Sequence, residues 1–242
     1  MKGVIFDLGD TLIEFTGDRA AVIRAGAEAM ARWYFKKKHI KLDDVALVET
    51  FMAERAAGNK IAEESQQEVL AQDTLRITLE KIAAPPSTGP LTTAAIKIFF
   101  GPEEEAYQPF PEAVDTLKIL KQQGLRLGLY SNATDDLLVQ RLVNRNGLRP
   151  WLSPTFSSAG WGWRKPRPEP FDLIAKKWRL PADEIVVVGD TPQADILGAQ
   201  NAGMKSILVW RHESTFAAGG QRIQPTVITA SLLELPETIS QL

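Results

Sequence analysis

The polar side chains best suited to chemistry in this sequence stand just after short apolar runs. They are Asp7, Asp10 and Thr11 after residues 4–6, Ser131 and Asn132 after 125–130, and Asp190 and Asp195 after 185–188. Lys165 lies in a proline-rich loop between the last two groups. Carboxylates bind hard cations such as Mg²⁺, while a lysine and hydroxyls can hold phosphate. If the fold brings these groups together, the sequence predicts a site for magnesium and a phosphoryl group.

The apolar runs are the predicted strands of one sheet. Strands are indicated at 4–6, 125–130, 155–157, 185–188, 206–210 and 226–228, and helices at 111–123, 135–146, 170–178 and 193–202. Strands that alternate with helices favour a parallel sheet covered on both faces. Ligands of such open sheets bind outside the carboxyl ends of the strands. The polar groups that follow the strands are therefore expected to meet in one crevice.

A segment with a helical pattern of residues separates the first predicted strand from the others. Apolar residues recur at helical spacing over 19–38, 61–82 and 91–100, and 83–90 is a loop rich in proline and glycine. Asp43 and Asp44 could cap a further helix through 50–57, which Gly58 and Asn59 could end. Because the first strand must join the sheet, we predict an α/β core at 1–14 and 108–242 with a helical cap inserted at 15–107.

Composition excludes several other classes of protein. The 242 residues are 44% hydrophobic and 24% charged, with a formal net charge of −2 and no cysteine. This balance is that of a globular protein. The charge argues against nucleic acid or a membrane as a partner, and the lack of cysteine excludes disulfides and thiolate chemistry. The apolar start is too short for a signal peptide or a membrane span, so we expect a cytoplasmic protein.

Each of these polar residues also has a structural interpretation when taken alone. An aspartate after a strand is often only a turn residue or a helix cap. Ser131 could be a capping hydroxyl, and Lys165 a solvated surface lysine. The functional interpretation depends on the joint placement of the four groups.

Four segments carry a resemblance to a known family. They are VIFDLGDTLIE at 4–14, LGLYSNA at 127–133, GWRKPRPEPF at 162–171 and VVVGDTPQADILGAQNAGM at 186–204. In this order they resemble the four motifs of the haloacid dehalogenase (HAD) superfamily, in a subgroup similar to phosphoglycolate phosphatases. The resemblance implies an α/β fold, a Rossmann-like doubly wound parallel sheet core, and an inserted α-helical cap domain.

The resemblance also implies roles for the motif residues. Asp7 would be the nucleophile that forms an aspartyl-phosphate, and it would bind Mg²⁺ together with the Gly9 carbonyl and Asp190. Asp195 would support the metal or hold Lys165. Thr11, Ser131 and Asn132 would bind the phosphoryl group. Lys165 would neutralise charge on Asp7 and the phosphate, without which a carboxylate cannot approach a phosphate dianion.

The first motif departs from the pattern of the family's phosphatases. They have a second aspartate two residues after the nucleophile, which acts as acid and base, whereas this chain has Gly9 there and Asp10 next. Such acid–base help is worth typically about 10² to 10⁴-fold. Three readings remain open. Asp10 takes the role in a left-handed backbone conformation, the enzyme is slow or uses good leaving groups, or the protein has lost hydrolysis and binds a ligand or partner.

Other residues near the motifs have weaker interpretations. Arg167 could attract an anionic substrate or pair with Glu169, and Trp161 and Trp163 could line the crevice or pack against the protein. In the predicted cap, Arg19, Arg24 and Lys36 to Lys38 could reach a second anionic group or form a solvated face. Gly17 and residues 109–111 are candidate hinges. We assign no role to the two histidines, His39 and His212.

The sequence thus predicts a Mg²⁺-dependent phosphohydrolase of a small phosphorylated metabolite, monomeric or homodimeric. The main alternative is a catalytically impaired binding or regulatory protein, which Gly9 motivates. A 2-haloacid dehalogenase is disfavoured because it needs no metal, whereas Asp190 and Asp195 suit one. A dinucleotide-dependent dehydrogenase is disfavoured because no G-x-G-x-x-G follows a predicted strand.

Overall fold

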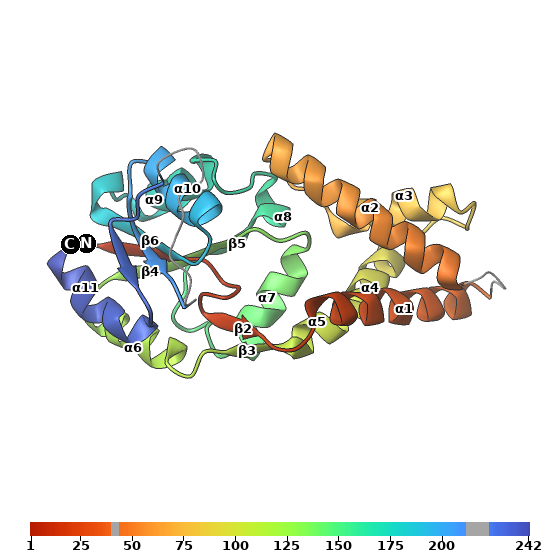
Figure 1. Ribbon diagram of the computed structural model, residues 1–242, viewed down its shortest axis with the longest axis horizontal. Helices are drawn as coiled ribbons and strands as arrows, with labels where there is room; N and C mark the ends of the chain where they lie inside the picture. Colours follow the sequence, from red (N-terminus) through yellow and green to blue (C-terminus); the bar gives the residue numbers. More distant parts are fainter. Residues whose placement is uncertain (40–43, 212–222) are drawn as a thin grey trace.

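The computed structural model describes residues 1–39, 44–211 and 223–242. Its centre is a parallel sheet of six strands in the order β5-β4-β1-β6-β7-β8 (Figure 1). The strands are β1 (Gly3–Phe6), β4 (Arg126–Ser131), β5 (Thr155–Ser157), β6 (Ile185–Gly189), β7 (Lys205–Val209) and β8 (Val227–Thr229). All six strands were predicted from their apolar runs, and the α/β fold with a doubly wound parallel sheet is confirmed.

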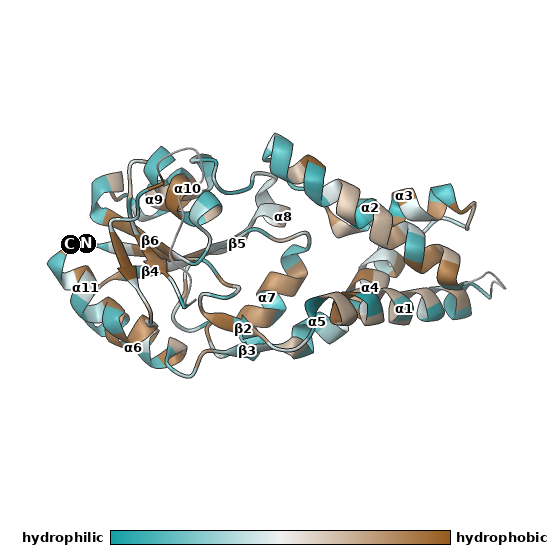
Figure 2. Ribbon diagram, in the orientation of Figure 1, coloured by the Kyte–Doolittle hydropathy of each residue, from teal (hydrophilic) through white to brown (hydrophobic). Residues whose placement is uncertain are grey.

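Both faces of the sheet are buried, which explains the uninterrupted apolar character of its strands. On β1, Val4 and Phe6 join one core cluster and Ile5 joins another on the opposite face. The first cluster contains side chains of α6 (Ala113–Gln122), α7 (Asp136–Arg145) and α11 (Leu235–Gln241). The second contains side chains of α9 (Glu169–Trp178) and α10 (Leu197–Asn201). Figure 2 shows the hydrophobic strands between the two helical layers.

The strand order creates a switch point next to β1. The chain leaves β1 for β4 and β5 on one side, and it returns to β6, β7 and β8 on the other. The crevice where ligands bind in such sheets lies at the carboxyl ends of the two strands where the direction changes. Here these are β1, which is followed by Asp7, and β6, which is followed by Asp190.

A helical insert leaves and re-enters the core through a small two-stranded ribbon. The antiparallel strands β2 (Ile13–Phe15) and β3 (Tyr107–Pro109) pair Phe15 with Tyr107. Between them lie α1 (Arg19–Lys38), α2 (Asp44–Ser65), α3 (Ala71–Lys81), α4 (Pro90–Phe99) and α5 (Gly101–Ala106), on the right of Figure 1. The predicted junctions at 14/15 and 107/108 fall inside this ribbon, which the sequence did not reveal because each strand has only three residues.

The helix boundaries in the insert differ from the prediction between residues 58 and 71, and α5 was not predicted. Gly58 and Asn59 lie inside α2 and do not end it, and the predicted helix over 61–82 is divided at 66–70. A side chain at position 58 would place its Cβ 3.0 Å from Val69 Cγ1. Glycine is therefore used for close packing, which outweighs its cost of about 1 kcal/mol in a helix.

Short elements complete the described part of the chain. They are α8 (Ser158–Trp161), a π-helical turn (Pro192–Ile196) and 3-10 turns at Ala182–Glu184 and Leu232–Glu234. No helix among the described residues has the length and apolar character to cross a bilayer.

Candidate active site

Lys165 holds two carboxylates at the carboxyl ends of β1 and β6. Its Nζ lies 2.5 Å from Asp7 Oδ1 and 2.7 Å from Asp195 Oδ1. Lys165 and Asp195 are almost fully buried, and the Asp7 side chain is 12% exposed. The second oxygen of Asp195 accepts a hydrogen bond from the Thr191 backbone N–H at 3.0 Å. A surface role for Lys165 is therefore wrong, and its charge is directed at Asp7.

The arrangement also suits a divalent cation. Carboxylate oxygens of Asp7, Asp190 and Asp195 lie within 4.8 Å of one another. Oxygen donors of this kind are what Mg²⁺ prefers. Thr11 Oγ1 donates to Asp190 Oδ1 at 3.0 Å, which fixes one oxygen of that carboxylate. Lys165 pairs with Asp7 and Asp195 and leaves the charge of Asp190 over, and this excess negative charge favours a cation.

The pKa values of the site reflect burial first and the neighbouring carboxylates second. Burial raises the pKa of the Asp7 carboxyl to about 7; Lys165 opposes this shift, and Asp195 and Asp190 reinforce it. Burial and the charge of Asp195 raise the pKa of Asp190 to about 6. Burial acts to lower the pKa of Lys165, but Asp195 and Asp7 outweigh it and raise that pKa above its ordinary value. Lys165 therefore stays charged beside Asp7.

Ser131 and Asn132 lie at the carboxyl end of β4, where the sequence predicted them, but their side chains have different surroundings. Ser131 is the last residue of β4, is 8% exposed and lines the same cavity as Asp7. The side chain of Asn132 accepts from the Lys165 backbone N–H at 2.9 Å and donates to its carbonyl at 3.0 Å. The amide of Asn132 is thus committed to the backbone of Lys165, and its position favours a role in placing the lysine.

Asp10 has the backbone conformation that the sequence suggested, with φ of 55°. Its carboxylate accepts from Arg19 Nη2 at 3.0 Å and from the Phe15 backbone N–H at 3.4 Å. The Asp10 side chain is half exposed. The carboxylate is therefore engaged with the start of the insert, and whether it acts as acid and base stays a prediction.

Apart from Thr11, which is buried beside Asp190, the predicted site residues line one cavity of about 780 Å³ between the sheet and the insert. Its core side includes Asp7, Gly9, Ser131, Lys165 and Asp190, and its other side is formed by residues of the insert. The insert contributes Arg19, Arg55, Asn59, Ala62, Glu63, Gln66, Phe100 and Glu103. This volume is within the usual range for small-molecule sites.

A family model for haloacid dehalogenase-like hydrolases matches residues 1–203. The chain belongs to this family. It is 27% identical over 211 residues to a glyceraldehyde 3-phosphate phosphatase of Methanocaldococcus jannaschii, a match that covers 86% of this chain and 85% of that protein. It is 35% identical to the glyceraldehyde 3-phosphate phosphatase of Methanothermobacter thermautotrophicus and 34% identical to a phosphoserine phosphatase of Thermus thermophilus. The first of these two matches covers 42% of this chain and 45% of the relative. The second covers 45% of this chain and 43% of the relative, so this chain spans less than half the length of each.

Solved structures of the family share the whole fold. A 2-haloacid dehalogenase from Pseudomonas syringae pv. Tomato DC3000 superposes with a TM-score of 0.74 at 26% identity. The superposition covers 100% of this chain and 99% of that one. The HAD resemblance and the Rossmann-like core are thereby confirmed.

Several of the weaker candidates lie away from the HAD site. Trp161 is 49% exposed, and its ring contacts Phe156 edge-on. The Trp163 ring is covered by the Arg167 guanidinium at 4.0 Å, and Arg167 also pairs with Glu169. Neither tryptophan lines the cavity that contains Asp7 and Lys165; both line a separate depression.

The basic residues of the insert lie partly on the surface and partly at the cavity. Arg24 pairs with Glu49 on the surface, and Lys36 to Lys38 form the last turn of α1. His39 ends that helix, whereas His212 lies outside the described residues. Of the basic residues named from the sequence in this insert, Arg19 is the one that lines the cavity.

Sequence reasoning missed further residues around the HAD motifs. Arg211 donates to the backbone carbonyls of Asp10 and Thr11 at 2.8 and 3.3 Å, and its position after β7 is a signal that could have found it. Tyr107 begins β3 and accepts a hydrogen bond from Arg19 Nη1 at 3.2 Å. Burial and the nearby Glu103 raise the pKa of Tyr107 to about 12, so this hydroxyl stays protonated at neutral pH.

Proposed function

We propose that this protein is a Mg²⁺-dependent phosphohydrolase of a small phosphorylated metabolite, acting through an aspartyl-phosphate on Asp7. The observation that carries the proposal is the 2.5 Å contact between Asp7 and the buried Lys165, beside the carboxylates of Asp190 and Asp195. Family membership and the names of the curated relatives, which are phosphatases, support the same chemistry.

The residues of the site divide the work of phosphoryl transfer. Asp7 attacks phosphorus and displaces the alcohol, and water later cleaves the aspartyl-phosphate and releases phosphate. Lys165 reduces the repulsion between Asp7 and the incoming dianion. Ser131 lines the cavity at the end of β4, where its hydroxyl would hold a phosphoryl oxygen.

The metal would be held by Asp7, Asp190 and the backbone carbonyl of Gly9. Mg²⁺ at this position supplies positive charge to the phosphoryl oxygens when it is bound. Asp195 would act indirectly, because both of its oxygens already have partners in Lys165 and Thr191.

The insert would act as the cap that selects the substrate. Its residues form one side of the cavity, so a metabolite whose phosphate contacts Lys165 would direct its other end at Arg55, Asn59 and Glu103. The curated relatives named above act on glyceraldehyde 3-phosphate and phosphoserine, which are metabolites of small size.

The P. syringae structure motivates a second candidate, a 2-haloacid dehalogenase. The acidic cluster argues against it, because that reaction needs a carboxylate nucleophile but no divalent metal. Release of chloride from 2-chloropropionate, with no release of phosphate from esters, would support this candidate over the proposed one.

The first test is phosphate release from 4-nitrophenyl phosphate with Mg²⁺ or with EDTA. We expect turnover that needs Mg²⁺ and is lost in Asp7→Asn, while Asp115→Asn on the exposed side of α6 behaves like the parent. Equal rates in Asp7→Asn and the parent would refute the proposal. A parent that binds phosphate but never turns over an ester would favour a binding protein.

A further inference from the structure

Gly9 leaves a space that a side chain from elsewhere in the chain occupies. A Cβ built on Gly9 would lie 3.4 Å from the Tyr107 hydroxyl oxygen, and its next two neighbours are also atoms of the Tyr107 ring. An aspartate at position 9 would therefore extend toward this hydroxyl. Tyr107 of β3 therefore lies where the aspartate side chain missing at position 9 would be. β3 is the strand through which the chain returns from the insert.

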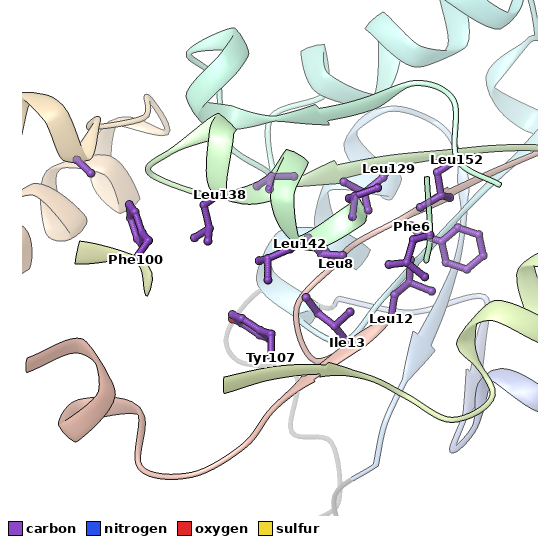
Figure 3. Close-up of a cluster of buried hydrophobic side chains, with 14 of the residues drawn as sticks. Phe6, Leu8, Leu12, Ile13, Phe100, Tyr107, Leu129, Leu138, Leu142 and Leu152 are labelled. Carbon is purple, nitrogen blue, oxygen red and sulfur yellow. The ribbon is translucent and has the colours of Figure 1, made fainter. Parts of the chain in front are cut away.

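Tyr107 is held firmly at this position. The residue is 8% exposed and pairs with Phe15 across the β2–β3 ribbon, where their rings meet edge-on at 5.2 Å. It belongs to the same buried cluster as Leu8 and Ile13, which lie within the first motif, and Figure 3 shows these side chains together. A buried ring with packed neighbours keeps its hydroxyl in one place.

The hydrogen bonds leave the proton of this hydroxyl free. Arg19 Nη1 donates to the Tyr107 oxygen at 3.2 Å, so the oxygen acts as acceptor in this contact. Within residues 1–39, 44–211 and 223–242 the hydroxyl donates to no protein atom. Tyr107, Arg19, Gly9 and Asp7 all line the same cavity, so this hydroxyl is free to donate its proton to a phosphate ester bound there.

We propose that Tyr107, supported by Arg19, is the acid and base that replaces the aspartate absent at Gly9. This inference rests on the proposed phosphohydrolase function. When an Asp7 oxygen bonds to phosphorus, the bond from phosphorus to the ester oxygen breaks, and that oxygen takes the proton of Tyr107. The guanidinium of Arg19 stabilises the phenolate that remains.

The second half of the reaction restores the protein. Water gives a proton to the Tyr107 phenolate and attacks phosphorus of the aspartyl-phosphate. The bond from phosphorus to the Asp7 oxygen breaks, phosphate leaves, and Asp7 is again a carboxylate. Water thus returns to Tyr107 the proton that Tyr107 gave to the alcohol, and no other reactant is needed.

Asp10 is less well placed for this role. Its carboxylate already accepts bonds from Arg19 and from the Phe15 backbone, and its side chain is half exposed. Asp10 and Tyr107 instead bind the same guanidinium from two directions, so Asp10 helps to orient Arg19.

The test compares two esters in Tyr107→Phe. An alkyl phosphate needs a proton on its leaving oxygen, whereas 4-nitrophenyl phosphate releases 4-nitrophenolate, which is a stable anion. We expect kcat/KM for the alkyl ester to fall by about 100-fold, with a small change for the aryl ester. Tyr34→Phe, which removes a hydroxyl bonded to the Pro85 carbonyl in the insert, is the matched control. It should leave the ratio of the two rates unchanged.

Gly9→Asp in the Tyr107→Phe protein supplies the second arm. The phenyl ring lacks the oxygen closest to the new side chain, so the added carboxyl has room and should restore turnover of the alkyl ester. Equal losses for both esters in Tyr107→Phe, or a selective loss in Asp10→Asn instead, would overturn the inference. These results leave the proposed function standing, whereas a parent that cleaves neither ester would overturn both.

Discussion

Glu68 and Arg164 form an ion pair that joins the insert to the core next to Lys165. Arg164 Nη1 lies 2.8 and 2.7 Å from the two oxygens of Glu68, whose side chain is fully buried. Ser158 Oγ also donates to Glu68. Backbone bonds reinforce the contact, from Glu68 N–H to the Gly162 carbonyl and from Arg164 N–H to the Gln66 carbonyl. The break between α2 and α3 is therefore a further place where the insert contacts the core, in addition to the β2–β3 ribbon.

Removing this pair should loosen the insert. Glu68→Ala leaves Arg164 largely buried without its partner, and we expect a loss of about 3 kcal/mol in the free energy of unfolding. Cleavage by a protease near residues 66–70 should also become faster. Denaturant unfolding and limited proteolysis measure the two effects.

A suitable control is Glu64→Ala, which removes an exposed pair with Lys60 at the end of α2. Surface pairs contribute about 0 to 1 kcal/mol. Equal stability of Glu68→Ala and the parent would show that the Arg164 contact does not hold the insert.

The raised pKa of Asp7 predicts how stability depends on pH in the absence of metal. Its pKa of about 7 in the folded protein exceeds the ordinary aspartate value of 3.8, so the folded state binds more protons between these values. The free energy of unfolding then falls as pH rises from about 4 to about 7, and it stays low above that range. Asp7→Asn cannot ionise there and should escape this loss.

Thermal melting in EDTA from pH 4.5 to 8.5 measures the effect. Asp7→Asn should melt above the parent at pH 8, by an interval that shrinks toward pH 4.5. Mg²⁺ should raise the melting temperature of the parent more than that of the variant, because the parent has the ionised Asp7 carboxylate to bind the metal and the variant does not. A parent that melts above Asp7→Asn at pH 8 without metal would contradict the prediction.

The sequence predicted the core because its signals are local. Residues 4–6 and 185–188 are apolar throughout, and only a strand buried on both faces suits such runs. The carboxylates that follow them meet because parallel strands end at one edge of the sheet. Asp7, Lys165 and Asp195 were therefore predicted as one group, and their contacts agree with that grouping.

The remaining parts depend on contacts between distant segments. Gly58 has the local signature of a helix end, but the packing of Val69 against it decides otherwise. Tyr107 lies next to Gly9 only because β2 and β3 pair, and three-residue strands give no periodicity to detect. The Glu68–Arg164 pair connects two loops whose separate sequences contain no sign of each other.

Asn132 should act by placing Lys165. Its amide spans the backbone N–H and carbonyl of that residue, so Asn132→Ala frees the loop that carries the lysine. Small displacements of a reacting group can cost about 100-fold in rate. We expect kcat for alkyl and aryl phosphates to fall by the same factor, in contrast to the selective loss in Tyr107→Phe.

The comparison with Asn144→Ala, an exposed position on α7, controls for loss of an amide elsewhere. Asn132→Asp retains an acceptor for the Lys165 N–H and should recover part of the rate. A change in KM with kcat unaltered would instead indicate that Asn132 binds the substrate directly.

The far side of the cavity offers polar groups that have no protein partner. Among the described residues, Arg55 Nε and Glu103 Oε2 are buried without a hydrogen bond, and both side chains line the cavity. A buried polar group without a partner costs about 1 to 3 kcal/mol, so a bound ligand that contacts both would recover this energy. A donor and an acceptor in the lining of one cavity suit a substrate with hydroxyl or amino groups beyond its phosphate.

Arg55→Met should therefore affect substrates differently. We expect KM to rise about tenfold for phosphate esters that carry polar groups at the far end, which corresponds to about 1.4 kcal/mol. 4-Nitrophenyl phosphate, which has no hydroxyl or amino group to place there, should keep its KM. Arg76→Met removes an exposed arginine of α3 and is the control. Equal changes for both kinds of ester would show that Arg55 shapes the insert and does not select the substrate.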